Sequence, residues 1–313
     1  MTLLQLRYIV KIVECGSMNE ASHELYVSQP ALSASVKELE GELGIEIFTR
    51  HAQGISLTAD GAEFLTYARQ ILDQTDLLEE RYRQTKPRRQ LCRVSTQHYM
   101  FAVEAFVEMI HSIEAEEYEF TIRETRTRDI IDQVARLQSE IGIIYQSGFN
   151  RKVISKLLRG RHLEFHPLFK ADLHVFLSRN NPLAGRERVT MEDLEPYPFL
   201  QYEQGEEGSF YYAEEAVWPE YPPKQITVTD RATMLNFIVG LNAYTVCTGI
   251  DNEDLNSEKI VTVPLVSDES MLVGWIVNGR TKMSRAAQLY LGKLREVIAG
   301  HGYALVEEEG AVS

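Results

Sequence analysis

Hydrophobic residues recur at helical spacing over the first fifty residues. A first helix, which Gly16 ends, is marked by Leu3, Leu6, Ile9, Val10 and Val13. Ser17 begins a second helix, and Ser28 begins a third, with Pro30 in the first turn, where the missing N–H costs no hydrogen bond. The third helix ends at Gly44. Residues 45–48 and 55–57 then read as two short strands, which predicts a small hairpin, or wing.

A longer helix is predicted from Thr58 or Asp60 toward Pro87. It carries residues at alternating intervals of three and four, the spacing of a coiled-coil seam: Gly61, Phe64, Ala68, Ile71, Thr75, Leu78 and Tyr82. The alternative is an amphipathic helix that packs on its own domain. We favour a dimer seam, because an isolated helix between two domains needs a partner for its apolar stripe.

From about residue 91 the pattern changes to strands that alternate with helices, which predicts parallel α/β sheets. This part is long enough for two lobes with a cleft between them. The expected organisation is residues 1–58 as a helical module with a wing, 59–88 as a linker and dimerisation helix, and 89–313 as the α/β part. Lobe I is expected at about 89–163 and 267–313, and lobe II at about 164–266.

Composition narrows the possible functions. The 313-residue chain has 32 basic and 46 acidic residues, a net charge of −14, which excludes binding of polyanions through bulk charge. The cysteines, Cys15, Cys92 and Cys247, lack disulfide or zinc spacing. With no run of 18 apolar residues, the expectation is a cytoplasmic protein that does not enter a membrane. No cofactor is expected. A metal site is not expected either, because His162 and His166, although four residues apart, flank an extended segment rather than a helix.

The second and third predicted helices have the residue types of a helix–turn–helix. Two helices that cross through a tight turn need a small contact residue, which Ala21 supplies. The outward residues of the third helix are then free to enter a DNA major groove, where glutamine and serine contact base edges: Gln29, Pro30, Ser33, Ser35 and Lys37. Taken alone, the pattern equally fits a structural helical subdomain.

A more specific signal is the block Ser28-Gln29-Pro30-Ala31-Leu32-Ser33 at this distance from the N-terminus, with Leu43-Gly44 and Leu57-Thr58 after it. With these motifs the chain strongly resembles the LysR-type transcriptional regulators over its whole length. The resemblance implies a winged helix–turn–helix, a dimerising linker helix and an effector domain shaped like periplasmic binding proteins. It also implies tetramers built from dimers, with double-stranded operator DNA and RNA polymerase as partners.

Downstream, Ser95–Tyr99, Arg123–Thr127, Ser139–Gly142 and Thr229–Thr233 look like a Gram-positive subgroup of that family. The subgroup is associated with methionine uptake, so genes of amino-acid or sulfur metabolism are the predicted targets. Ala34 departs from the family, because many members carry a basic residue there.

Few phosphate contacts are expected from one DNA-binding module. Residues 1–58 hold four basic and seven acidic residues, a net charge of −3. Lys37, Arg50 and His51 are the candidate phosphate contacts. Because such contacts supply much of DNA affinity, we expect weak binding by one module and useful affinity only through linked modules.

Ligands of open α/β sheets lie beyond the carboxyl ends of the strands, beside helix N-termini. Backbone N–H groups and hydroxyls there suit an anionic or amino-acid-like effector. By resemblance and position, the candidate effector residues are Ser95, Thr96, Gln97, Thr125, Thr127, Tyr145, Gln201, Tyr202 and Thr248. A plain helix cap or a core tyrosine is the alternative for several of them.

Two other classes of function compete with an effector-responsive regulator. A small-molecule solute-binding protein fits the α/β part but does not explain the N-terminal module. An enzyme is not expected, because the sequence has no Gly-rich phosphate loop, no Gly-x-Ser-x-Gly elbow and no His-Glu-x-x-His.

Overall fold

The computed structural model describes residues 1–51, 54–83, 90–115, 117–205, 210–215, 222–251 and 259–306. The chain forms two compact units, Met1–Arg88 and Arg89–Ser313, and each is considered by itself. No helix within these described ranges is long and apolar enough to cross a membrane.

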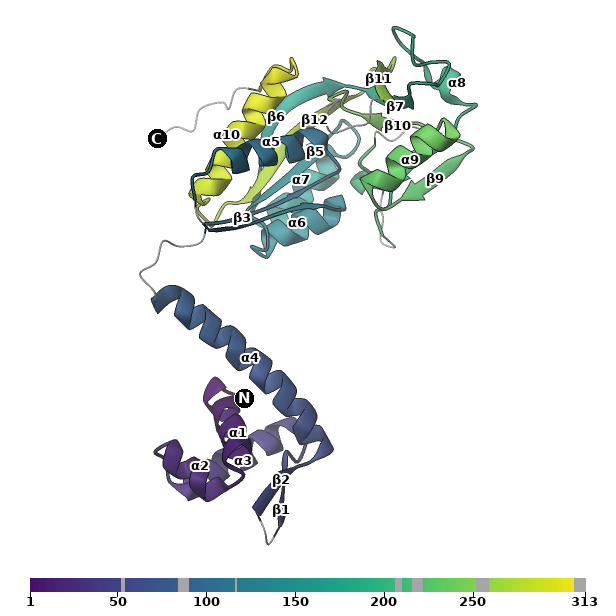
Figure 1. Cartoon of the computed structure of the whole chain (residues 1–313). Helices are drawn as coiled ribbons and strands as arrows, with labels where there is room; N and C mark the ends of the chain where they lie inside the picture. Colours follow the sequence, from purple (N-terminus) through teal and green to yellow (C-terminus); the bar gives the residue numbers. More distant parts are fainter. Residues whose placement is uncertain are drawn as a thin grey trace. The chain divides into compact units, whose positions relative to one another are not determined.

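Unit 1 consists of three short helices, a hairpin and a long helix (Figure 1). Its elements are α1 (Leu3–Cys15), α2 (Met18–Glu24), α3 (Gln29–Leu43), β1 (Phe48–His51), β2 (Gly54–Leu57) and α4 (Ala59–Arg83). The expected helix boundaries therefore hold closely, but the first strand covers Phe48–His51 rather than residues 45–48. Gly16 and Gly44 end α1 and α3 in the left-handed region, with φ of 65° and 71°, where glycine has no steric penalty.

The core of unit 1 is formed by apolar residues from α1, α2, α3, the start of the hairpin and α4: Ile9, Ile12, Ala21, Leu32, Val36, Leu39, Ile47, Phe48 and Leu65. Ala21 is fully buried, as the helix–turn–helix pattern requires. Glu40 Oε1 accepts hydrogen bonds from the backbone N–H groups of Ile47 (2.8 Å) and Phe48 (3.2 Å), which ties α3 to the hairpin.

Unit 2 is built around a five-stranded sheet with the order β4-β3-β5-β12-β6. Its strands are β3 (Gln90–Thr96), β4 (Tyr118–Glu124), β5 (Ile141–Gln146), β6 (Leu163–Asp172) and β12 (Ser270–Asn278). β3 pairs in parallel with β4 and β5, but β12 pairs antiparallel with both β5 and β6. The expectation of parallel sheets therefore holds for β3, β4 and β5 but is wrong for β12, which runs antiparallel to both of its neighbours.

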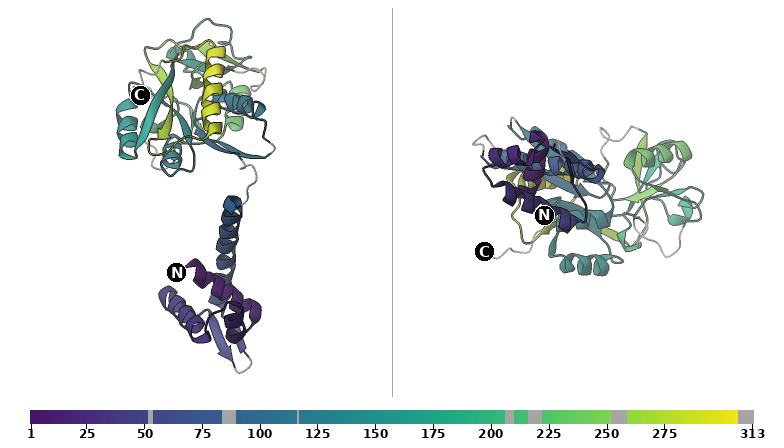
Figure 2. Two further views of the ribbon diagram at one scale, coloured as in Figure 1. Left: turned by 90° about the vertical axis from the view of Figure 1, so that its left-hand side faces the viewer. Right: turned by 90° about the horizontal axis from the view of Figure 1, so that it is seen from below.

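Helices cover both faces of this sheet (Figures 1 and 2). Residues of α5 (Met100–His111) and α10 (Arg285–Gly300) share one core with Ile143 and Trp275. Residues of α6 (Thr127–Ala135) and α7 (Arg151–Gly160) share another with Ile144 and Ile276. Because successive strand residues point to opposite faces of the sheet, Ile143 and Ile144 pack into different cores, and so do Trp275 and Ile276.

A second group of strands follows β6. β7 (His174–Ser178) pairs antiparallel with β10 (Thr245–Cys247) and β11 (Ile260–Pro264), and β8 (Phe199–Tyr202) pairs in parallel with β9 (Gln225–Val228). The group also includes the helices α8 (Met191–Leu194) and α9 (Arg231–Leu241), whereas the short 3-10 helix η1 (Phe210–Tyr212) packs beside α7 on the first sheet. The first sheet extends to Asp172, because β6 pairs with β12 along its length. The expected lobe boundary at residue 163 is therefore too early.

Candidate functional site

The outward side of α3 carries the residues predicted to contact DNA. Leu32, Val36 and Leu39 face the core, and Pro30 and Lys37 are exposed on the opposite side. Gln29 and Ser33 are half-buried on one flank of the helix. Ser35 is half-buried on the other flank, since each residue advances 100° around a helix. Gln29, Pro30, Ser33 and Lys37 thus form one continuous surface, and Ser35 lies at its far edge.

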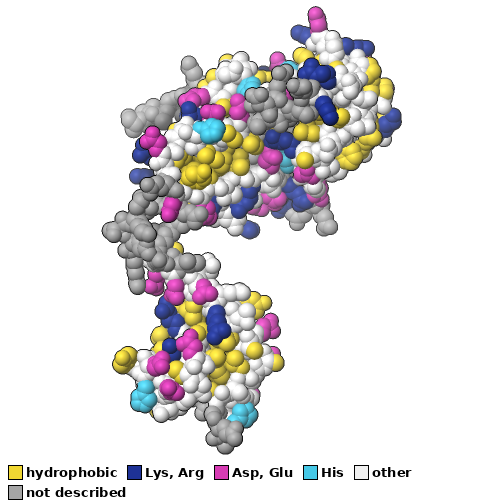
Figure 3. Space-filling view, viewed as in Figure 1, with side chains coloured by type: hydrophobic (Ala, Val, Ile, Leu, Met, Phe, Trp, Pro, Cys, Tyr) yellow, Lys and Arg dark blue, Asp and Glu magenta, His cyan; other side chains and the backbone are white. Residues whose placement is uncertain are grey.

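Arg7 and Lys11, two of the four basic residues of the DNA-binding module, are already in ion pairs. Arg7 pairs with Asp76 (2.9 Å), and Lys11 with both Glu14 and Glu24. Lys37 has no ion-pair partner within the described part of the chain. His51 Nε2 lies 3.0 Å from Ser56 Oγ in the hairpin, and the Arg50 side chain lies outside the described residues. Figure 3 shows acidic and basic side chains interspersed on the visible face of unit 1, which fits the weak affinity expected of one module.

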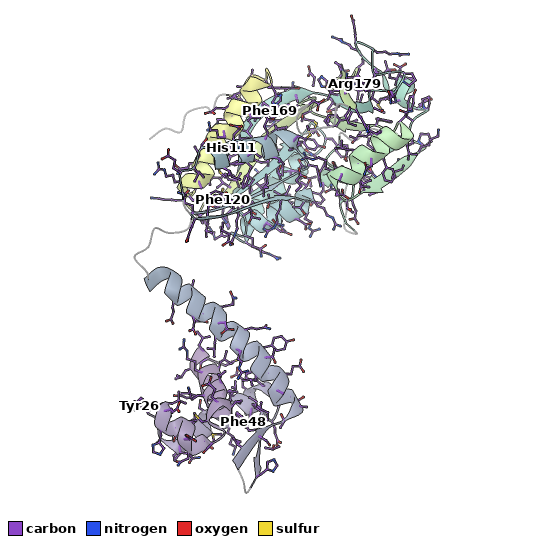
Figure 4. All side chains as sticks on the ribbon, viewed as in Figure 1. Tyr26, Phe48, His111, Phe120, Phe169 and Arg179 are labelled. Carbon is purple, nitrogen blue, oxygen red and sulfur yellow. The ribbon has the colours of Figure 1, made fainter. Side chains whose placement is uncertain are left out.

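The helix–turn–helix turn contains a strained and exposed aromatic residue. Tyr26 has φ of 55°, in the left-handed region that bulky residues rarely adopt. Its side chain is 96% exposed and projects away from the helices (Figure 4). Because no packing compensates for this conformation, the turn is a weak point of the motif.

The apolar stripe of α4 is divided between two environments. Ala68 and Leu72 are buried against Leu6 of α1, and Phe64 packs against the same cluster. Tyr67, Ile71 and Leu78 are exposed. Thr75 donates a hydrogen bond to the Ile71 carbonyl, and the Tyr82 side chain lies outside the described residues. The part of the predicted seam that contains Phe64 and Ala68 therefore faces its own unit.

Unit 2 contains a cavity of about 50 Å³ between the start of α5 and the second group of strands. Its lining is largely apolar, with side chains that include Phe101, Phe176, Met234, Leu235 and Met271. The polar lining comes from four places in the chain: His98, Tyr202, the pair Glu214-Glu215, and Arg231 with Thr245 and Thr248. A small molecule with an apolar body and a few polar groups suits such a lining.

Two buried acids lie beside the cavity. Glu214 Oε2 accepts a hydrogen bond from the backbone N–H of His98 (2.9 Å) and lies 2.8 Å from His98 Nδ1. The His98 ring stacks on Tyr202, with ring centroids 3.7 Å apart. Glu215 Oε1 accepts a hydrogen bond from Tyr202 N–H (2.9 Å). Burial, with a smaller contribution from the charge of Glu214, raises the pKa of Glu215 to about 8.

Three polar atoms at the cavity are buried without a hydrogen-bond partner among the described residues: Glu215 Oε2, Arg231 Nε and Thr245 Oγ1. Arg231 also forms an ion pair with Glu124, at the end of β4. Burial lowers the pKa of Arg231 to about 10. Because buried polar groups are normally hydrogen-bonded, these three atoms favour a polar guest.

Only two of the nine predicted effector residues, Tyr202 and Thr248, line the cavity. Three others form a buried network beneath it. Gln97 Nε2 donates to Thr127 Oγ1 (2.6 Å), and Gln97 Oε1 accepts from the Tyr145 N–H (3.0 Å). Thr127 Oγ1 donates to the carbonyl of Tyr212 (2.8 Å), and the Tyr145 hydroxyl donates to the carbonyl of Glu215 (3.0 Å).

The remaining four residues lie outside the cavity lining. Ser95 Oγ donates to Gln133 Oε1 (2.6 Å) and lies 2.6 Å from Ser139 Oγ, so it faces α6 rather than the cavity. Alternation along β3 explains this, since Cys92 and Val94 face α5 and α10. Gln201 donates to Thr227 across the β8–β9 pair (3.2 Å). Thr96 Oγ1 is buried without a partner in the described part, and Thr125 is half-buried.

The sequence patterns did not single out His98, Arg231, Thr245 or the acid pair as a group. Glu214-Glu215 follows Phe210-Tyr211-Tyr212 after one residue, Ala213, but acidic residues are rarely buried, so the sequence gives no clear signal for this pair. Tyr211 stacks on Phe149, with ring centroids 4.8 Å apart, and Tyr212 packs on the core of α6 and α7. Within the described ranges, no group of three or more His, Cys, Asp or Glu side chains is arranged to hold a metal ion.

Comparison with known proteins agrees with this two-part organisation. Residues 3–62 match the helix-turn-helix model of bacterial regulatory proteins of the lysR family, and residues 114–299 match the LysR substrate binding domain. The chain is 28% identical to the HTH-type transcriptional regulator CysB of Haemophilus influenzae over 219 residues, which are 66% of this chain and 63% of that protein.

It is 25% identical to the uncharacterized HTH-type transcriptional regulator YvbU of Bacillus subtilis, over 67% of this chain and 69% of that one. The solved structure of a Corynebacterium glutamicum OxyR C206 mutant has the same fold, with a TM-score of 0.52, 17% identity, and coverage of 96% of this chain and 94% of that chain. The second family model alone spans more than half of the sequence. The chain therefore belongs to the LysR family of bacterial regulatory helix-turn-helix proteins.

Proposed function

We propose that the protein is a transcription regulator that binds double-stranded DNA through α3 and the β1–β2 wing. The observation that carries the proposal is the outward surface of α3, where Gln29, Pro30, Ser33 and Lys37 lie together over residues 29–37. Glutamine can bond adenine in two places in the major groove, and serine reads several base edges.

Dimerisation through α4 would bring two such surfaces to one operator. The exposed residues Tyr67, Ile71 and Leu78 are spaced four and seven apart. Residues at these intervals share one side of a helix, as in a coiled coil. The proposed seam thus includes Tyr67 and excludes Ala68, which is already buried within the unit. Tetramers built from such dimers, and contact with RNA polymerase, remain expectations from the family.

The cavity of unit 2 is the proposed effector site. Its apolar side chains, together with Arg231, Thr245 and Glu215, support an amino-acid-like or otherwise acidic small molecule as the guest. For such a guest to regulate, it must bind two arrangements of the protein with different affinity. Control of amino-acid or sulfur uptake genes is the corresponding prediction for the target genes.

The proposal is tested by retention of a labelled operator duplex over a series of salt concentrations. Lys37→Ala should weaken binding and lower the slope of log affinity against log salt by about 1 for each bound headpiece. Lys293→Ala removes a lysine that is paired with Glu296 in α10, and it should leave the slope unchanged. An unchanged slope in Lys37→Ala would remove α3 from the DNA interface.

A further inference from the structure

The N-terminus of α5 receives a carboxylate from a distant part of the chain. Tyr99 is the residue before the helix and provides no side-chain cap. The backbone N–H of His98, just ahead of it, instead donates to Glu214, which is 116 residues away. Glu214 Oε1 also accepts a hydrogen bond from Gln204 Nε2 (3.3 Å). An acid at a helix N-terminus is favoured by the free N–H groups and the helix dipole.

Residues 210–215 are attached to the start of α6 and to β5 by two of the side chains that were predicted to hold an effector. Thr127 bonds the carbonyl of Tyr212, and Tyr145 bonds the carbonyl of Glu215. Glu214 and Glu215 are only 6% and 3% exposed. Two of the residues predicted to bind an effector, Thr127 and Tyr145, are therefore already hydrogen-bonded to residues 212 and 215 of the same chain.

In the neighbouring cavity, by contrast, some buried polar atoms of the described residues lack hydrogen-bond partners. Glu215 Oε2 and Thr245 Oγ1 are buried there without hydrogen-bond partners in the described part of the chain, and both residues are more than nine-tenths buried. Arg231 Nε is in the same condition. A guest in the cavity would therefore find both donors and acceptors within reach of Glu214.

We propose that Glu214 is an internal substitute for the acid group of the effector, so that a carboxylate-bearing small molecule binds by displacing Glu214 from His98. This proposal rests on the proposed function, because it takes the cavity of unit 2 to be the effector site. The guest's carboxylate takes the His98 N–H, and its other polar groups reach Glu215, Arg231 and Thr245. Its apolar body lies against Phe176, Met234 and Met271.

Displacement would also change the protein. Glu214 lies between Tyr212 and Glu215, whose carbonyls accept hydrogen bonds from Thr127 of α6 and Tyr145 of β5. We expect its departure from His98 to weaken both bonds. The guest and Glu214 thus compete for one site, and occupation of that site by the guest selects an arrangement in which residues 210–215 are released.

The test uses acetate as the probe and the thermal midpoint of the full chain as the readout. In Glu214→Ala the carboxylate site is vacant, so acetate should stabilise the protein saturably. At about five times its Kd, acetate should raise the midpoint by about 2–4 °C over chloride at equal ionic strength. Wild-type protein and Glu187→Ala, which alters an exposed acid, should show no such difference. Acetamide, which has no charge, should have no effect on any of them.

Tyr145→Phe provides a second variant in case Glu214→Ala does not fold. It keeps the aromatic ring and Glu214 but removes the bond to residue 215, so its response to acetate should be intermediate. The proposal is overturned if acetate stabilises neither variant more than it stabilises the wild type. DNA retention by the same proteins is measured separately. A failed acetate response would then overturn the role of Glu214 without overturning DNA binding, and the reverse also holds.

Discussion

Glu215 is buried beside a second acid, and its folded pKa of about 8 lies above its ordinary value of 4.5. The folded state therefore keeps a proton that the unfolded state releases between about pH 4.5 and pH 8. Its contribution to stability is present at low pH and is lost as the pH rises through this window. The slope from this one group is at most about 1.4 kcal/mol per pH unit.

Replacing Glu215 by glutamine should remove this dependence. Urea unfolding at a series of pH values should show that Glu215→Gln loses less stability between pH 5 and pH 8 than the wild type does. Glu187→Gln, an exposed acid in the same unit, should follow the wild type. Parallel curves for wild type and Glu215→Gln would mean that Glu215 is ionised in the folded protein.

Tyr26 has a strained backbone conformation, with φ of 55°. Its left-handed backbone suits asparagine far better than tyrosine, and its exposed ring has no packing to lose. Tyr26→Asn should therefore raise the free energy of unfolding by about 0.5–1 kcal/mol. His23→Asn, a helical position of the same motif, should bring no gain. A loss of stability in Tyr26→Asn would show that the ring packs in the assembled protein.

At the scale of elements, the junction between the wing and α4 depends on Gly61. A Cβ at this position would lie 2.1 Å from the carbonyl oxygen of Ile47, which is backbone and cannot rotate away. Gly61→Ala should therefore destabilise unit 1 by about 1–3 kcal/mol, as overpacking does.

Gly41 is the matched control, because it also lies within a helix and a Cβ there would meet no atom within 4 Å. Gly41→Ala should be stabilising by about 0.5–1 kcal/mol. Calorimetry of the two variants measures both effects, and equal midpoints would contradict the role given to Gly61.

The elements of unit 1 could be predicted because local signals define them. Ser28, Pro30 and Gly44 mark the ends of α3 within one residue, and the 3.6-residue period identifies its buried face. The pairing of β6 with β12 could not be predicted in this way, since it joins residues about a hundred positions apart. The cavity shows the same limit. Residues adjacent to strand ends were identified, but Glu214 reaches His98 only through the tertiary fold.

At the scale of the whole molecule, oligomerisation should depend on the exposed side of α4. Ile71→Lys combined with Leu78→Lys places charge in the proposed seam and should convert dimers to monomers. Asp73→Lys alters an exposed residue on the opposite side of the helix and should leave the assembly intact. Light scattering coupled to size exclusion measures the mass of each variant, and an unchanged mass for the double variant would rule out this seam.

The same double variant should lose most of its affinity for DNA. Each headpiece has few free cations, so two linked headpieces are needed to supply enough phosphate contacts. Titration of one operator by fluorescence anisotropy should give at least a tenfold weaker Kd for the monomeric variant than for Asp73→Lys. Equal affinities would mean that one headpiece is sufficient.

Selection of bound duplexes from a random library tests the DNA-binding account most directly. The full-length protein should enrich two related half-sites about one helical turn, or a multiple of it, apart. Gln29→Ala should keep that spacing but lose preference at one position in each half-site, because a glutamine contact to a base edge is removed. Enrichment of no common sequence, or an identical preference in the variant, would contradict recognition of DNA by α3.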